Sequence, residues 1–107
     1  MSIFRTDDPR RIRRSLSARL GATRRYIDDD LLYEDIHRRL NAAVEALLWM
    51  RQRGVLMLEE REFTGIPTFN GDASLAAEVL SLLCAIGAMI WHPSSLAEYG
   101  AIQYHVA

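Results

Sequence analysis

A chain of 107 residues is long enough to bury one hydrophobic core, so a single domain over 1–107 is expected. Half of its residues are hydrophobic and a quarter are charged, which excludes a disordered or low-complexity chain. The single cysteine, Cys84, excludes a disulfide framework. The first residues also lack the apolar run of a signal peptide, and a cytoplasmic location is therefore expected.

The charge is divided unevenly along the chain. Residues 1–25 contain eight Arg and two Asp, a local charge of +6, whereas residues 26–107 contain five Arg and twelve acidic residues, a charge of −7. The two parts sum to the overall −1. A basic arm on an acidic body is typical of proteins that bind nucleic acid or an acidic partner. Alternatively, the arm lies on its own acidic body, and the sequence leaves both interpretations open.

The first predicted helix runs from Pro9 to about residue 20. Asp8 has the side chain of an N-cap, Pro9 fits the first helical position, and Gly21 is the expected stop. Apolar residues recur at every fourth position: Ile12, Leu16 and Leu20. Because this stripe is thin, the Arg-rich helix is expected to be weakly anchored and the most mobile part of the fold.

The second predicted helix, 31–53, has the strongest pattern in the chain. Its apolar residues repeat at the helical period: Leu32, Ile36, Leu40, Ala43, Leu47 and Met50. Gly54 is the expected terminator. Segment 55–69 then combines glycines, a proline and a charge run, which predicts a short extended or hairpin-like excursion. Its apolar side chains are expected to tuck under the helices: Phe63, Ile66 and Phe69.

The stretch 73–91 is predicted to be the central helix of the fold. It carries one charge, Glu78, in nineteen residues, and a helix that is apolar on every side is a buried one. Asp72 is its expected cap and Pro93 its expected end. Small residues recur four apart, at Ala73, Ala77, Ser81 and Ala85, and Ala88 continues the row. This row is expected to let another helix approach closely. A membrane span is disfavoured because the uncharged run is only thirteen residues.

A last helix is predicted from 96 to about 104. Ser95 and Glu98 have the spacing of a capping box at its start, and the helix would cover the small residues of 73–91. The sequence therefore predicts an all-α fold, a compact bundle of about four helices around the buried helix 73–91.

No catalytic, cofactor or metal motif is found. Glu34 and His37 have the i,i+3 spacing of half a di-iron ligand set, but no other Glu is followed by His three positions later. Cys84 lies in the most apolar segment without a basic neighbour in sequence, which predicts an inert thiol. Glycine-rich phosphate loops and nucleophile elbows are also absent from the sequence. We expect a protein that is not an enzyme and needs no cofactor or metal.

The region around helix 31–53 resembles the second half of a winged-helix unit, with 55–69 as its wing. A helix-turn-helix needs a break of three or four residues between its helices. Residues 40–43 continue the apolar periodicity without such a break, which disfavours sequence-specific readout of DNA. Non-specific contact with nucleic acid would use the arginines of the first helix: Arg10, Arg11, Arg13 and Arg14.

The favoured functional residues lie on helix 31–53, opposite its main stripe. At 100° per residue Trp49 falls together with Ala42 and Ala46, and the flanking residues are Arg38 and Arg53. Trp and Arg beside small residues are typical of a binding hot spot. Burying this strip requires either another molecule or the chain's own first helix, and the sequence does not choose between them.

The sequence thus favours a non-catalytic protein-binding protein, a small regulator or inhibitor of a larger complex. Small helical chains from phages and mobile elements, the anti-CRISPR class among them, often work in this way. The partner is an unidentified protein, with a homodimer over the Trp49 strip as a further arrangement and no role at a membrane. The alternative is a nucleic-acid-binding accessory protein or transcriptional regulator that uses the Arg-rich first helix.

Overall fold

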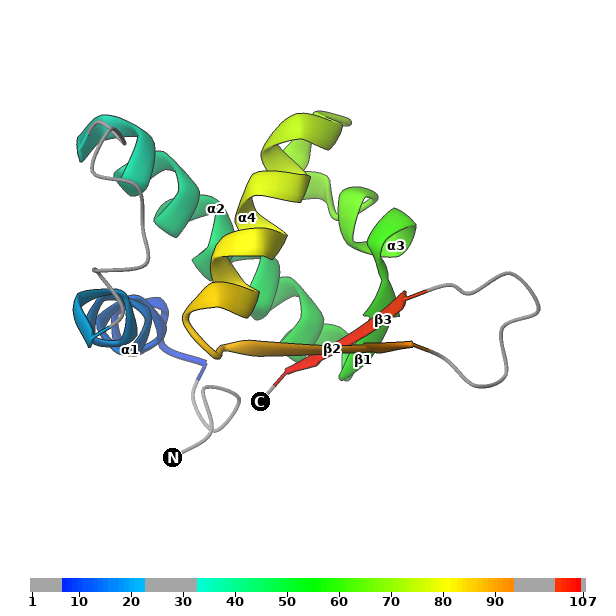
Figure 1. The fold of residues 1–107 in the computed structure, drawn as a ribbon, viewed down its shortest axis with the longest axis horizontal. Coiled ribbons are helices and arrows are strands. Elements are labelled where there is room, and N and C mark those ends of the chain that lie inside the picture. Colours follow the sequence, from blue (N-terminus) through cyan, green and yellow to red (C-terminus); the bar gives the residue numbers. More distant parts are fainter. Residues whose placement is uncertain (1–6, 23–32, 94–101, 107) are drawn as a thin grey trace.

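The computed structural model describes residues 7–22, 33–93 and 102–106 (Figure 1). The elements in chain order are α1 (Pro9–Ala22), α2 (Tyr33–Arg53), β1 (Met57–Glu59), α3 (Glu60–Thr64), the 3-10 helix η3 (Pro67–Phe69), α4 (Ala73–Ala85), β2 (Met89–Pro93) and β3 (Ile102–Val106). The fold is mostly helical, as expected, but it also contains a three-stranded antiparallel sheet in the order β1-β3-β2.

Helix α1 begins as its sequence predicts. The Asp8 carboxylate accepts the backbone N–H of Arg10 at 2.9 Å, which satisfies one of the free donors at the start of the helix. Ile12 and Leu16 are fully buried in the core, and α1 packs on α2. The helix continues through Gly21 to its end at Ala22, so Gly21 is not the stop that the sequence indicated.

Helix α2 is in contact with α1, α4 and η3, and α4 is in contact with α2, α3, η3 and β2 (Figure 1). The predicted apolar stripe is buried along most of its length: Leu40, Ala43, Leu47 and Met50. The helix ends at the predicted glycine. Gly54 has φ 68°, and the N–H of Val55 bonds to the carbonyl of Met50 at 2.9 Å, which is the Schellman pattern of helix termination.

The helix predicted over 73–91 is only thirteen residues long. It ends because Gly87 takes the left-handed conformation, with φ 73°, and the N–H of Ala88 bonds back to the carbonyl of Leu83 at 2.8 Å. Beyond this second Schellman turn the chain enters β2. Gly87, and not Pro93, therefore terminates the helix, and the last third of the predicted helix is turn and strand.

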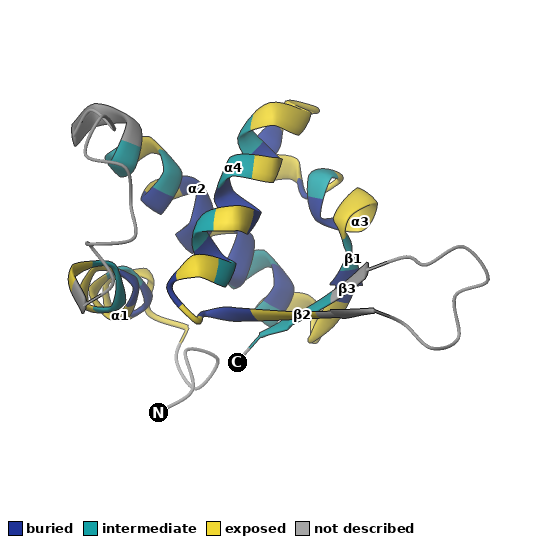
Figure 2. Cartoon of the chain, viewed as in Figure 1, coloured by how far each residue is buried: buried dark blue, intermediate teal, exposed yellow. Residues whose placement is uncertain are grey.

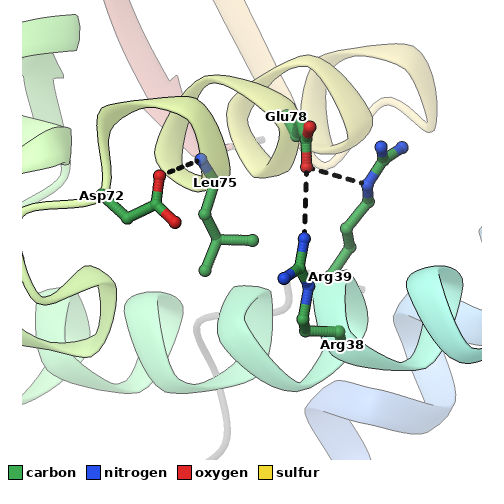
Figure 3. A network of polar contacts seen from close by, with 5 residues as sticks. All are labelled: Arg38, Arg39, Asp72, Leu75 and Glu78. Carbon is green, nitrogen blue, oxygen red and sulfur yellow. Dashed lines mark hydrogen bonds and ion pairs between the residues drawn. The ribbon is translucent and has the colours of Figure 1, made fainter.

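The start of α4 agrees with the sequence, and its crossing with α2 carries ion pairs. The Asp72 carboxylate accepts the N–H of Leu75 at 3.0 Å (Figure 3). The Glu78 carboxylate lies 3.9 Å from the guanidinium of Arg38 and 3.3 Å from that of Arg39, both on α2. Because these groups are partly exposed, the pairs contribute no more than about 1 kcal/mol. None of the described helices has the length and apolar character needed to cross a membrane.

The row of small residues on α4 faces solvent, contrary to the sequence prediction. The exposed members are Ala73, Ala77, Ser81 and Ala85. The neighbouring face of the helix enters the core instead: Ala76, Val79, Leu80 and Leu83. Figure 2 shows the exposed positions of α4 turned away from α2. Most of the buried small residues lie on α2, namely Ala42, Ala43 and Ala46, whereas α4 contributes Ala76.

The excursion after α2 contains a short strand and a short helix. The backbone N–H of Glu59 donates to the Glu62 carboxylate at 3.0 Å, one half of a capping box that turns the exposed charge run into α3. Phe63, Ile66 and Phe69 are buried, as predicted, and the ring centroids of the two phenylalanines are 5.1 Å apart. The expected hairpin is not formed here, because β1 pairs with β3 and not within the segment.

Strand β3 occupies the end of the predicted last helix. The predicted capping residues, Ser95 and Glu98, lie outside the described residues. Strand β3 is the middle strand of the sheet and pairs with both β1 and β2. Its sequence alternates apolar and polar side chains, the period of a strand. The prediction of a helix over these residues is wrong because their period of two was overlooked.

From α2 onwards the elements follow the order of a winged helix. The order α2, β1, α3, η3, α4, β2 and β3, with β3 between β1 and β2, is similar to the order of elements in that fold. The resemblance seen in the sequence had 55–69 as the wing, whereas in the structure the last two strands, β2 and β3, follow α4. Here α4 takes the position of the third helix, which follows α3 after a connection over 65–72, longer than the usual helix-turn-helix turn.

Replacing Ala with Leu is expected to have different effects on stability on the two faces of α4. Ala76→Leu adds three heavy atoms to a packed core and should lower the free energy of unfolding by about 1–3 kcal/mol. Ala77→Leu, one residue further on the exposed face, should change it by less than about 0.5 kcal/mol. Urea unfolding of both variants measures the difference, and equal losses would contradict the packing of α4.

Candidate interaction surface

The strip predicted around Trp49 is mostly interior. Ala42 is 7% exposed and Ala46 is fully buried, so both belong to the core of the chain. Trp49 is half-buried, and the guanidinium of Arg53 lies 4.5 Å from the centre of its ring. Arg38 remains exposed but is paired with Glu78 of α4. The two alanines are therefore not open to a partner.

The segments that border this strip belong to the chain itself. A shallow groove beside Trp49 is bordered by Ile66 and Thr68, from the connection between α3 and α4. The hydroxyl of Thr68 also donates to the carboxylate of Glu45 on α2. The expected cover was α1 or another molecule, and not α4 or this connection, because a helical wheel does not tell which element packs on which face.

The basic arm packs on the body through apolar side chains. Three of its predicted binding residues are exposed: Arg10, Arg11 and Arg14. The fourth, Arg13, is half-buried and donates to Asn41 and His37 of α2. An ion pair joins the start of the arm to the body, but it runs from Asp7 to Arg51, with the acid on the arm. Among the described residues, α1 is held by its buried apolar side chains and by this ion pair.

Trp91 lies on a surface that the sequence analysis did not single out. With 57% of its area exposed, it is one of four large apolar side chains that the described residues expose, all in or next to the sheet. It forms a wall of a groove of about 500 Å³ between α4 and the sheet. The other lining residues are Ser81, Cys84 and Ala85 of α4 and Tyr104 of β3.

The strand register explains why Trp91 reaches this groove. Trp91 is paired with Tyr104, and Tyr104 with the buried Leu58, so the three side chains share the face of the sheet that packs on the helices. Since β2 is an edge strand, Trp91 has no neighbouring strand on its outer side. Trp91 is therefore a residue of the core-facing side that the fold leaves half uncovered.

The exposed face of α4 continues the groove with very small side chains. It consists of Ser74, Ala77, Ser81 and Ala85. We refer to these residues together with Cys84, Trp91 and Tyr104 as the α4–β2 surface. It contains no charged residue, because Glu78 is turned toward the arginines of α2 (Figure 3). A bare helix face beside an exposed tryptophan is suited to contact with another apolar surface.

Two titratable groups of the groove, Cys84 and Tyr104, have raised pKa values. Burial raises the pKa of the Cys84 thiol, so the protonated form is favoured at neutral pH. The pKa of Tyr104 is also raised, first by burial and then by the charges of Glu60 and Cys84. Within the described ranges, no three His, Cys, Asp or Glu side chains gather to hold a metal ion.

Comparison with protein-family models, with curated proteins and with solved structures finds no match to this chain. The function is therefore argued from the groove and from the side chains that the helices expose. Trp91 and Tyr104 escaped the sequence analysis because both fell inside predicted helices. The available signals were Gly87 within the apolar run and the alternation over 102–106.

The raised pKa of Cys84 predicts slow alkylation. Because the thiolate is the reacting form, iodoacetamide should modify the folded protein at pH 7.5 more slowly than the urea-unfolded chain. The rate in the folded protein should still be rising at a pH where the unfolded chain has reached its plateau. Mass spectrometry of timed samples measures both rates, and equal rates would mean an accessible, ordinary thiol.

Proposed function

We propose that this chain is a non-catalytic protein-binding protein whose α4–β2 surface holds the partner. The observation that carries the proposal is Trp91, a large aromatic side chain that stands beside a groove and is 57% exposed. Tryptophan next to small residues gives a partner a large contact area at little cost in side-chain entropy. A small chain of this kind would regulate or inhibit a larger complex by occupying part of its surface.

The chemistry of α4 favours a protein over DNA as the partner. In helix-turn-helix proteins the recognition helix enters the major groove, where Arg, Lys, Asn and Gln read bases and phosphates. The exposed face of α4 has none of these residues, and the one charged residue of the helix, Glu78, is paired with the arginines of α2. A helix that approaches phosphates without a cation gains nothing from counterion release. The winged-helix arrangement thus presents a helix suited to apolar contact.

Replacing Trp91 should weaken binding without unfolding the protein. For Trp91→Ala we expect a melting temperature within a few degrees of the parent and a loss of partner affinity of more than about 2 kcal/mol. Leu56→Ala, at an exposed apolar residue outside the surface, is the matched control and should bind as the parent does. Affinity capture from the source cell, quantified by mass spectrometry with nuclease present, identifies the partner for these measurements.

Trp49→Ala separates this proposal from the hypothesis drawn from the sequence. Its ring is half-buried and packs against the core, so its loss should lower stability while partner capture at a temperature below its melting point is retained. If Trp91→Ala captures the partner as well as the parent does, and Trp49→Ala does not, the binding surface lies on α2.

Nucleic-acid binding is the second candidate, and it depends on the outer side of α1. The exposed arginines there are Arg10, Arg11 and Arg14. If all three contact phosphates of duplex DNA, the log of the affinity should fall with the log of salt concentration with a slope near about −2.7. Replacing the three with Ala should abolish binding, whereas Arg61→Ala on α3 should not change the slope. No binding at about 50 mM salt would remove this candidate.

A further inference from the structure

The floor of the α4–β2 surface has the dimensions of a helix-docking site. Its exposed residues, from Ser74 to Ala85, recur three or four positions apart and none is larger than serine. At 1.5 Å per residue they extend over about 16 Å, or about three helical turns. Side chains this short let the ridge of a second helix settle close to the backbone of α4, at the short end of the usual 8–10 Å between axes.

The groove at the C-terminal end of this floor supplies an anchoring point. Trp91 and Tyr104 form its walls on the sheet side, and Cys84 lies on the helix side. Each of these side chains offers apolar area, and with about 500 Å³ the groove has room for large apolar side chains of a docked helix. A helix with an apolar stripe would lie along α4 and insert the end of that stripe beside Trp91.

The rim of the surface on the α3 side is acidic. Helix α3 packs against both α4 and β3, and it begins with the run Glu59, Glu60, Arg61 and Glu62. Glu60 and Glu62 are exposed, and the charge of Glu60 reaches Tyr104 in the groove. The arginines of α1 do not offset this rim, because α1 lies on the other side of α4 from α3 (Figure 1).

We infer that the occupant of the α4–β2 surface is an amphipathic helix of about three turns that carries Lys or Arg along the flank facing α3. The inference rests on the proposed function and specifies the chemical character of the partner segment that binds. The uncharged floor accepts the apolar stripe, and the exposed carboxylates of α3 attract the basic flank, which gives orientation and a faster association rate. An acidic helix would meet like charge on the same rim and is rejected.

Selection from a display library tests this chemistry directly. The intact chain is immobilised, and a library of helix-forming peptides of about 14 residues, randomised on all faces, is enriched for binders. We expect the enriched peptides to have an apolar stripe and a net positive charge. Synthetic copies should be helical when bound and should lose at least about tenfold in affinity for Trp91→Ala and for Ala77→Leu, which narrows the floor without unfolding the protein.

A matched pair of charge variants isolates the rim. Glu60→Gln with Glu62→Gln removes two negative charges and keeps an acceptor for the capping bond of Glu59. The selected peptides should bind it about three- to tenfold more weakly at low salt. The control, Ser15→Lys with Ala18→Lys, changes the net charge equally on the exposed side of α1 and should change affinity less than twofold.

Several outcomes overturn the inference. These are the absence of any enriched peptide, enriched peptides that are acidic or neutral, or peptides that bind in extended form along the edge strand β2. If such peptides still lose affinity for Trp91→Ala, the proposed protein-binding surface stands and only the chemistry of its occupant is wrong. If they bind Trp91→Ala as they bind the parent, they occupy a different surface, and the inference also fails.

Discussion

The left-handed turn at Gly87 is the constraint on which the arrangement of the chain depends. It ends α4, and the guanidinium of Arg19 on α1 donates to its carbonyl at 2.7 Å, so the turn also joins the first helix to the body. Continued as a helix, the chain would carry Trp91 about 9 Å beyond Ala85 along the axis. The turn instead brings both residues to one groove. The candidate surface exists because this helix stops where a residue without a Cβ permits it.

Local signals in the sequence were sufficient for much of the fold. The cap at Asp8, the stripe of α2, its stop at Gly54 and the cap at Asp72 are formed by residues within one or two helical turns of each other. The strands depend on distant partners, since β3 forms by pairing with 57–59 and 89–93. The run 73–91 is apolar on every side, so its composition suits a buried helix and a buried strand equally, and an isolated glycine costs a helix only about 1 kcal/mol.

The candidate site was less accessible to sequence reasoning for a related reason. The helical period correctly gave the angular position of Trp49, Ala42 and Ala46 on α2, but it carries no information on which neighbour packs there. A row of small residues likewise does not show whether it lies in the interior or on the surface. On α2 they lie in the interior, whereas on α4 Ala77 and Ala85 face solvent. Which row is covered is decided by the chain path, and that path is set by tertiary contacts.

The topology and the side chains of this protein lead to different expectations of function, and the side chains carry more weight. A winged-helix order of elements is used for DNA binding because its third helix can present cations to a phosphate backbone. Here that helix presents Ala and Ser, three exposed arginines lie on α1, and α3 exposes two carboxylates, Glu60 and Glu62, beside one arginine, Arg61. An acidic rim beside an uncharged floor repels phosphates and attracts cationic side chains. The helix that has the position of a recognition helix is therefore the one that we propose holds a basic helix of a partner protein.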